Sequence, residues 1–418
     1  MASMANPLAK DLDLSLNDVL SKVREGYSPQ IAEALRAELA VVAAASYADI
    51  PCCLAFILEG PSGTGKSALV EMLHPTKENE QYLRREDRFT AASFVSNASN
   101  VKKDKLKEID LLPKIAGKVM LTKELASMFC NDDKALREIF GIVTAVLDGK
   151  GYTTATGTHG ERGYKENCRF NWIGATTPVP TRVHNIMALF GCRFLFYECN
   201  FPEPSYDEIL EKMKSSSSYS MEKECNAVVN SFVNQHFERH GVSTVHAADV
   251  HIPDAIFKGL FDYARLMTLG RRAVNVEKRA FGDDLLEFNY YASPAEGVYR
   301  PLEMFRSIAI GSALIARRHS LTADDVAIVR HIAFSSIPNK RRVLLRRLIY
   351  NSGTLTSTDV VEQLGCSKPT ALQWMRELAA TELCDHTERK SGSNSANEIS
   401  LRDEFRYLIQ QPLDATER

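Results

Sequence analysis

The sequence lacks several features that would define its class at once. It has no apolar run long enough to span a membrane and no repeat with a solenoid period. Its formal net charge is only −2, so no global field favours nucleic acid or an anionic membrane, and any basic surface must be local. These absences leave an ordinary globular protein of 418 residues, which is enough for about two to three domains.

The cysteines also lack a recognisable pattern. There are nine of them, an odd number, and none forms a CxxC pair or a zinc-ligand spacing. Scattered cysteines of this kind are typical of reduced thiols in a cytosol-like compartment. The first residues lead into an acidic amphipathic stretch instead of the apolar centre of a signal peptide. We therefore expect a cytoplasmic protein that does not contact a membrane.

What the sequence does contain is a G-x-x-x-x-G-K-[ST] string. The short apolar run of residues 52–58 before it predicts a buried parallel strand, and residues 67–74 after it predict a helix. Strand, glycine loop and helix together are the context that a phosphate-binding P-loop requires. The cofactor-binding residues predicted in this way are Gly60, Pro61, Ser62, Gly63, Thr64, Gly65, Lys66 and Ser67.

The residue types of this loop suit a nucleoside triphosphate. Glycine tolerates positive φ and adds no bulk, so the backbone can wrap an anion. The N–H groups and the dipole at the helix start favour phosphate. Lys66 is expected over the β- and γ-phosphates, and the Ser67 hydroxyl is expected at a Mg²⁺ position. We predict ATP and Mg²⁺ as cofactors.

Strands and helices alternate around this motif. Two helices are predicted within residues 8–47, and a further one over residues 134–147. The glycine-rich residues 148–164 predict a hairpin or an ordered loop. Further strands are predicted over residues 89–96, 117–122, 169–177 and 191–197. Strands separated by helices indicate an α/β fold with a parallel, doubly wound sheet.

The pattern becomes helical after residue 202 and changes again near residue 338. Helices are predicted over residues 222–239, 254–269, 301–317 and 323–335. Three more helices and two short strands give the outline of a winged helix-turn-helix domain, over residues 341–350, 356–365, 367–380, 383–387 and 398–401. The predicted domains are N-terminal helices, a nucleotide-binding core, a helical lid and a winged helix domain, over residues 1–48, 49–203, 204–337 and 338–418.

A winged helix domain normally places its third helix in the major groove of DNA. The predicted nucleic-acid contacts are Lys368, Gln373 and Arg376 on that helix, Arg389 and Lys390 on the wing, and Lys340, Arg341 and Arg342 on the first helix. Winged helix domains also dock proteins, so a protein client is the alternative partner.

Residues from about 30 to 335 resemble the AAA+ ATPases, within the branch that contains MoxR-like ATPases and minichromosome-maintenance helicases. The most specific segments are Arg300-Pro301 and residues 317–326, which read RRHSLTADDV. The resemblance implies a P-loop AAA+ sheet core with an α-helical lid. It also implies ATP hydrolysis and a ring-forming homo-oligomer, with a hexamer favoured.

The same resemblance implies roles for four residues outside the P-loop. Arg300 matches the lid arginine called sensor 2, and Thr177 takes the sensor 1 position after the fourth core strand. Arg193 is the first choice for an arginine finger on a neighbouring subunit's phosphoryl group, and Arg182 is the second. The alternatives are a surface arginine for Arg300 and a structural ion pair for Arg193.

The metal side of the site departs from the family pattern. The strand of residues 117–122 leads into Lys123-Glu124, where the family has Asp-Glu. Glu124 matches the catalytic glutamate that polarises the attacking water, and it is the predicted metal ligand beside Ser67. The Lys123 ammonium cannot ligate Mg²⁺. Either a nearby carboxylate takes the metal role and hydrolysis is slow, or ATP acts mainly as an assembly switch.

The glycine-rich residues 148–164 lie where this branch inserts a hairpin that grips substrate. His159, Arg162 and Lys165 are therefore candidates for phosphate contacts, with an ordinary exposed loop as the alternative. Three functions fit these observations: an ATP-driven motor, replication initiator or mobile-element factor acting on DNA; a MoxR-like remodeller of a protein; and an ATP-gated regulator with little turnover.

Overall fold

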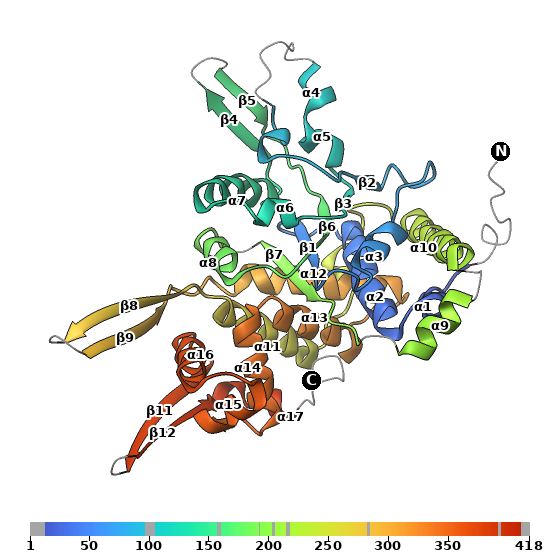
Figure 1. Ribbon diagram of the computed structural model, residues 1–418. Coiled ribbons are helices and arrows are strands. Elements are labelled where there is room, and N and C mark those ends of the chain that lie inside the picture. The colour runs from blue at the N-terminus through green and yellow to red at the C-terminus, as the bar shows by residue number, and fades with distance from the viewer. Residues whose placement is uncertain are drawn as a thin grey trace. The chain divides into compact units, whose positions relative to one another are not determined.

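The computed structural model describes residues 13–96, 105–156, 160–191, 193–202, 205–214, 218–281, 285–391 and 394–410 (Figure 1). Its contacts divide the chain into two compact units. The first unit comprises Met1–Val179, Arg193–Lys258 and Glu303–Val329. The second comprises Pro180–Cys192, Gly259–Leu302 and Arg330–Arg418.

The first unit contains a five-stranded, all-parallel sheet in the order β2-β3-β6-β1-β7. Its strands are β1 (Leu54–Glu59), β2 (Leu83–Arg85), β3 (Val119–Thr122), β6 (Asn171–Thr176) and β7 (Phe194–Glu198). Every residue of β1 and β6 is buried, as expected for strands covered on both faces. The predicted α/β class with a parallel sheet is confirmed.

Helices cover both faces of this sheet. On one face, α2 (Pro29–Ala43) packs against β1 and β6, and the Asn171 amide donates to the Val41 carbonyl at 2.8 Å. On the other face lies α7 (Asp133–Leu147), whose Phe140 ring is 6.1 Å from that of Phe194. Trp172, the neighbour of Asn171 in β6, lies 5.8 Å from the same Phe194 ring. Alternation along β6 thus directs successive side chains to opposite layers.

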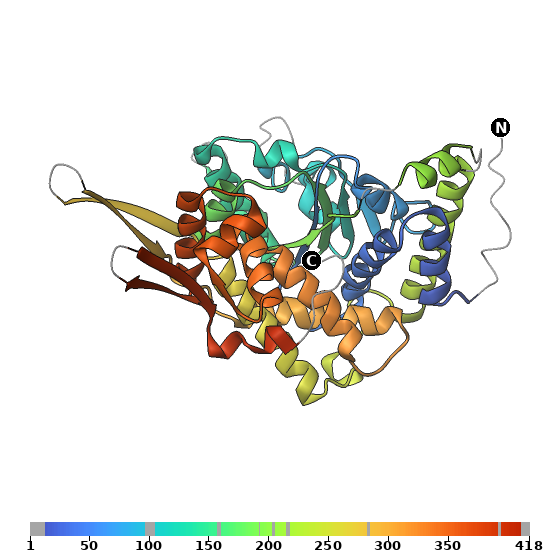
Figure 2. The same ribbon diagram turned by 60° about the horizontal axis from the view of Figure 1, so that its bottom comes forward.

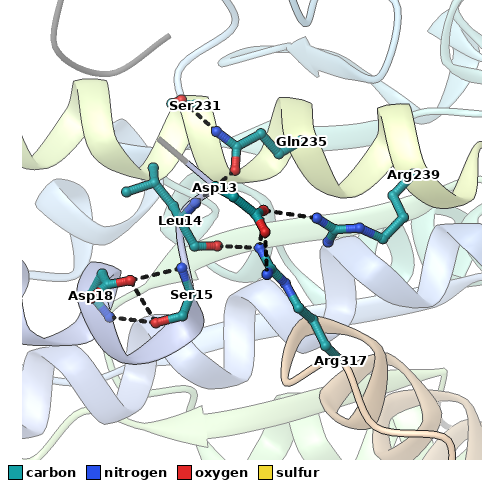
Figure 3. A network of polar contacts seen from close by, with 8 residues as sticks. All are labelled: Asp13, Leu14, Ser15, Asp18, Ser231, Gln235, Arg239 and Arg317. Atoms are coloured by element: carbon teal, nitrogen blue, oxygen red, sulfur yellow. Dashed lines mark hydrogen bonds and ion pairs between the residues drawn. The ribbon is translucent and has the colours of Figure 1, made fainter. Parts of the chain in front are cut away.

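An ion-pair network anchors the start of the described chain (Figure 3). The Asp13 carboxylate accepts from Arg239 at 3.0 Å and from Arg317, and the Leu14 N–H donates to Gln235 at 3.0 Å. Ser15 then caps α1 (Leu16–Gly26) in a capping box with Asp18. The network joins α1 to α10 (Ser218–His240) and to the turn after α12 (Tyr299–Ile315).

The turn between α12 and α13 (Ala323–Ser335) is held by a second network. Arg318 donates from both terminal nitrogens to Asp325, at 2.8 and 2.7 Å, and Asp325 is fully buried. The Thr322 N–H donates to the same carboxylate at 2.8 Å, which caps α13. The side chains of residues 318–325 therefore have a structural role, since they close the turn.

The second unit contains α8 (Thr181–Leu189), most of α11 (Asp254–Gly270) and the C-terminal elements. The latter are α14 (Asn339–Tyr350), β10 (Thr354–Thr356), α15 (Ser357–Leu364), α16 (Lys368–Ala380), β11 (Cys384–Ser391), β12 (Asn394–Leu401) and α17 (Tyr407–Gln410). The three predicted helices and two predicted strands are present, and β10 adds a third strand in the order β10-β12-β11.

One strand prediction was wrong, and one hairpin was not predicted. Residues 89–96 form no strand, because Phe89 and Phe94 instead pack their rings together, 5.6 Å apart, and Phe89 also contacts Trp172. The sheet edge is β2, which precedes them. The hairpin of β8 (Val274–Phe281) and β9 (Leu285–Ala292) was not predicted; with β11 and β12 it extends to the left of the second unit in Figures 1 and 2.

The remaining elements are shorter. They are α3 (Lys66–Met72), α4 (Leu106–Ile109), α5 (Leu111–Ile115), α6 (Ala126–Phe129), α9 (Tyr206–Lys214), and the predicted hairpin of β4 (Tyr152–Thr156) and β5 (Gly160–Tyr164). Among the described residues, no helix combines the length and apolar character that a membrane crossing requires.

Candidate functional site

The glycine loop connects β1 to α3 at the carboxyl edge of the sheet. Gly65 has φ +85° and directly precedes the helix, so its backbone adopts a conformation that L-residues rarely take. A Cβ atom on Gly65 would lie 2.7 Å from the Ile31 side chain, and one on Gly60 would lie 2.5 Å from the Cys199 carbonyl oxygen. The loop therefore depends on glycine for both its bend and its packing.

Lys66, the first residue of α3, is held by the loop that precedes it. Its ammonium donates to the carbonyl oxygens of Gly60 at 2.7 Å and Pro61 at 2.5 Å. Burial lowers the pKa of Lys66, and the nearby negative charges of Glu124 and Glu59 partly oppose this effect. The ammonium is thus placed at the centre of the loop.

The end of β6 lies beside this loop, because Thr176 pairs with Glu59, the last residue of β1. The Glu59 carboxylate accepts from the Val179 N–H at 2.7 Å and so fixes the turn after β6. Thr177 opens that turn and is half-buried. The predicted sensor 1 residue is therefore at the same sheet edge as the glycine loop.

Glu124 follows β3 by two residues, and β3 is the strand next to β6. Glu124 is exposed, and its carboxylate accepts from the Ala126 N–H at 2.8 Å, at the start of α6. Its charge contributes to the pKa of Lys66, so the two side chains share one electrostatic environment. Lys66, Ser67, Thr177 and Glu124 are brought together at the carboxyl ends of three adjacent strands, where ligands of open α/β sheets bind.

Lys123 has a partner that sequence reasoning missed. Its ammonium forms an ion pair with Glu71 of α3, and Glu71 also accepts from Arg85 with an N–O distance of 3.2 Å. Glu71 lies four residues after Ser67, so both residues occupy one face of α3. This spacing was the signal available in the sequence.

The donors at this edge do not make the oxygen-rich, anionic site that Mg²⁺ prefers. Within the described ranges, no group of three or more His, Cys, Asp or Glu residues is placed to hold a metal ion. The predicted ligands are the Ser67 hydroxyl and the Glu124 carboxylate, and one oxygen of that carboxylate accepts from the Ala126 N–H. Lys123 adds a positive charge to the same region.

Arg193 is a structural residue in this arrangement, which corrects its choice as the arginine finger. Its side chain is 5% exposed, and its Nε and Nη2 atoms lie 3.1 and 3.0 Å from the Asp148 carboxylate at the end of α7. A guanidinium buried within its own protomer cannot reach a neighbour's nucleotide. Arg182 is exposed on α8, and Arg300 is half-buried at the start of α12; both belong to the second unit.

The predicted hairpin of residues 148–164 is present as β4 and β5, and its basic side chains have protein partners. Arg162 donates to the Ser96 carbonyl at 3.3 Å, and Lys165 pairs with Glu161 at 2.7 Å. Tyr164 donates to the buried Asp110 carboxylate at 2.7 Å, which ties the hairpin base to the segment before α5. His159 lies outside the described residues.

Arg341 and Arg342 are not surface residues, which corrects their prediction as phosphate contacts. Each is 3% exposed. Arg341 donates to the carbonyls of Gly270 and Arg272, at 3.2 and 2.6 Å, and Arg342 donates to the Ser335 carbonyl at 2.7 Å. The Gly270 and Ser335 carbonyls end α11 and α13, where helices leave oxygens without intrahelical partners. Burial lowers the pKa of Arg341 to about 10.

The other predicted nucleic-acid contacts are more accessible. Lys340, Lys368 and Gln373 are exposed, and Arg376 is half-buried. The Gln373 amide donates to Glu377 at 2.8 Å. The side chains of Arg389 and Lys390 lie outside the described set.

Comparison of the chain with protein-family models and with curated proteins finds no match. The case for function therefore depends on the residues of the site.

Proposed function

We propose that this chain is an AAA+ ATPase that assembles into a ring or other oligomer and couples ATP binding and hydrolysis to action on DNA. The observation that carries the proposal is the meeting of the glycine loop, Thr177 and Glu124 at one edge of a parallel sheet. An anion-binding loop beside a carboxylate and a hydroxyl is the arrangement needed to hold a triphosphate and orient water.

The elements outside the sheet support the same proposal. Helices α12 and α13 suit the helical lid, with Arg300 as its sensor 2 arginine and Arg182 as the remaining candidate for an intersubunit finger. Helices α14 to α16 and the three-stranded sheet after residue 338 suit a winged helix domain. Lys340, Lys368 and Gln373 are its accessible candidates for DNA contact.

A second candidate function is an ATP-gated regulator with little turnover. The ion pair between Lys123 and Glu71 favours it, because a cation stands where the family places a metal-orienting carboxylate. In this case ATP binding itself changes the assembly state, and hydrolysis is slow. The third possibility, a remodeller of a protein client, predicts an ATPase rate that DNA does not change.

Two measurements test these proposals. Calorimetry should show ATP binding that Lys66→Ala weakens by at least about tenfold, because a charge-assisted contact to phosphate is lost. Turnover should then be compared with and without DNA, for the wild type and Glu124→Gln. DNA stimulation that Glu124→Gln abolishes supports the motor. Negligible turnover in both proteins supports the regulator, and no ATP binding rejects every version.

A further inference from the structure

The ammonium of Lys123 is paired with the helix that follows the nucleotide loop. Lys123 directly follows β3, its side chain is 36% exposed, and its partner Glu71 is 24% exposed. Glu71 also holds Arg85, which pairs in turn with Asp87 at 2.7 Å. Lys123 is therefore held in a connected set of charges at the end of the strand, instead of extending freely into solvent.

This set of charges is joined to the P-loop helix through Glu71. Ser67 and Glu71 lie on one face of α3, separated by about one helical turn of 5.4 Å. Lys123 reaches Glu71 from β3, so its ammonium stands on the same side of α3 as the Ser67 hydroxyl. A lysine side chain has four methylene groups, and a change of rotamer moves its ammonium over a comparable distance.

The charged residues around Lys123 favour an ammonium group over a divalent cation as the partner of the phosphates. A triphosphate brings several negative charges, and Mg²⁺ usually neutralises part of them. Here Lys66 and Lys123 are both present, Glu124 is the predicted metal ligand, and the nearby Glu71 carboxylate is already paired with Lys123 and Arg85. A divalent cation beside Lys123 would be repelled, whereas the ammonium can donate to phosphate oxygens directly.

We propose that Lys123 is a resident cation of the nucleotide site, so that this chain binds ATP without requiring Mg²⁺. This inference rests on the proposed nucleotide binding and specifies how the site meets the charge of its ligand. Glu71 holds the ammonium in place before the nucleotide arrives, and the phosphates compete for it afterwards.

The test is the affinity for ATP, measured by calorimetry in excess EDTA and in millimolar Mg²⁺. We expect the wild-type dissociation constants in the two buffers to agree within about threefold. Lys123→Met should weaken binding in EDTA by about tenfold or more, because one close charge is removed. Lys123→Arg should bind like the wild type in EDTA, and Lys123→Asp should bind well only with Mg²⁺.

Lys118→Met is the matched control. Lys118 precedes the same strand at its other end and donates to the Glu80 carbonyl at 2.7 Å, so the variant loses the same charge far from the P-loop edge. It should bind ATP like the wild type in both buffers. The proposal is overturned if Mg²⁺ removal weakens wild-type binding tenfold, or if Lys123→Met equals the wild type in EDTA. Absence of wild-type binding in both buffers rejects nucleotide binding itself.

Discussion

Glu38 is a fully buried carboxyl group on α2, and neither of its oxygens has a hydrogen-bond partner among the described residues. Burial raises the pKa of Glu38 well above its ordinary value. It lies close to Cys199, whose carbonyl packs against Gly60 of the P-loop. Glu38 is therefore a buried carboxyl group close to the residue that packs against the P-loop.

The raised pKa makes stability depend on pH with a definite sign. The folded state keeps the Glu38 proton, whereas the unfolded chain loses it above about pH 4.3. The free energy of unfolding should therefore fall with rising pH, by up to about 1.4 kcal/mol per unit from this group, until the folded pKa is reached. Glu38→Gln should remove that slope in urea unfolding between pH 5 and 8. Glu33→Gln, an exposed change on the same helix, should keep it.

Arg193 offers a second residue-scale prediction, because a buried ion pair and an arginine finger differ in what they stabilise. Arg193→Ala should lower the free energy of unfolding by about 2 kcal/mol, less than for a fully buried pair because Asp148 is 41% exposed. Arg182→Ala should change stability by less than about 0.5 kcal/mol. Chemical denaturation measures both. Wild-type stability with lost turnover in Arg193→Ala would instead restore its role as a finger.

At the level of secondary-structure elements, adjacent basic residues at the start of α14 differ in burial. Lys340 is exposed, whereas its neighbour Arg341 is buried and donates to the last carbonyl of α11, that of Gly270. Helix α14 thus caps the end of α11 through Arg341 and presents the Lys340 ammonium to solvent. A basic cluster read from sequence divides here into a surface part and an internal part.

This division predicts different phenotypes for adjacent residues. Arg341→Met should lower the free energy of unfolding by about 2 kcal/mol, since buried carbonyls lose their donors, and should leave the salt slope of DNA binding unchanged. Lys340→Ala should leave stability unchanged and reduce the slope of log K against log[salt] by about 1 if it contacts a phosphate. Denaturation and fluorescence anisotropy measure the two effects. An unchanged slope in Lys340→Ala would remove this residue from the DNA surface.

Asp325 connects the turn after α12 to α13, and this network also predicts a measurable effect. Asp325→Ala should lower the free energy of unfolding by about 3 kcal/mol, because it breaks a buried pair with Arg318 and removes the helix cap. Asp324→Ala, at the next position in the same turn of the helix, is the control and should cost less than about 1 kcal/mol. Similar losses for both variants in chemical denaturation would contradict the assignment.

At the scale of the whole molecule, the C-terminal elements are part of the second unit and not a separate tail. Arg272 pairs with Glu382 at 2.9 Å, and Arg265 pairs with Glu404 at 2.6 Å. The Tyr407 hydroxyl also donates to the Asp262 carbonyl of α11 at 3.1 Å. These contacts and the capping by Arg341 all join residues after 338 to the segment around α11.

The junction near residue 338 should therefore resist proteolysis. Ser336 and Ile337 are 2% and 0% exposed, so a protease must unfold this region to cleave it. Limited trypsin digestion followed by mass spectrometry should give early cuts in exposed α9, where Tyr206 is 75% exposed, and not after Lys340. Early release of a C-terminal fragment beginning near residue 340 would show that the tail is an independent domain.

Local patterns were sufficient for much of this fold. The buried strand, glycine loop and helix around Lys66 follow from neighbouring residues alone, as do the hairpin of residues 148–164 and the C-terminal helices. The strand prediction for residues 89–96 was wrong because the aromatic side chains of this segment pack in the core while its backbone joins no sheet. The β8–β9 hairpin was missed because the surrounding sequence reads as helical. Glycine spacing and apolar periodicity report backbone geometry, and therefore they predict elements well.

The roles of the charged residues were settled only by contacts between distant parts of the chain. The sequence does not show whether an arginine is buried and caps a helix, as Arg341 does, or is exposed to solvent. The position of the Lys123 ammonium is set by its ion pair with Glu71. Glu71 lies 52 residues earlier in the chain, and the two side chains meet only in the folded structure. Burial and pairing set the energy of a charge, and both depend on neighbours that chain order does not specify.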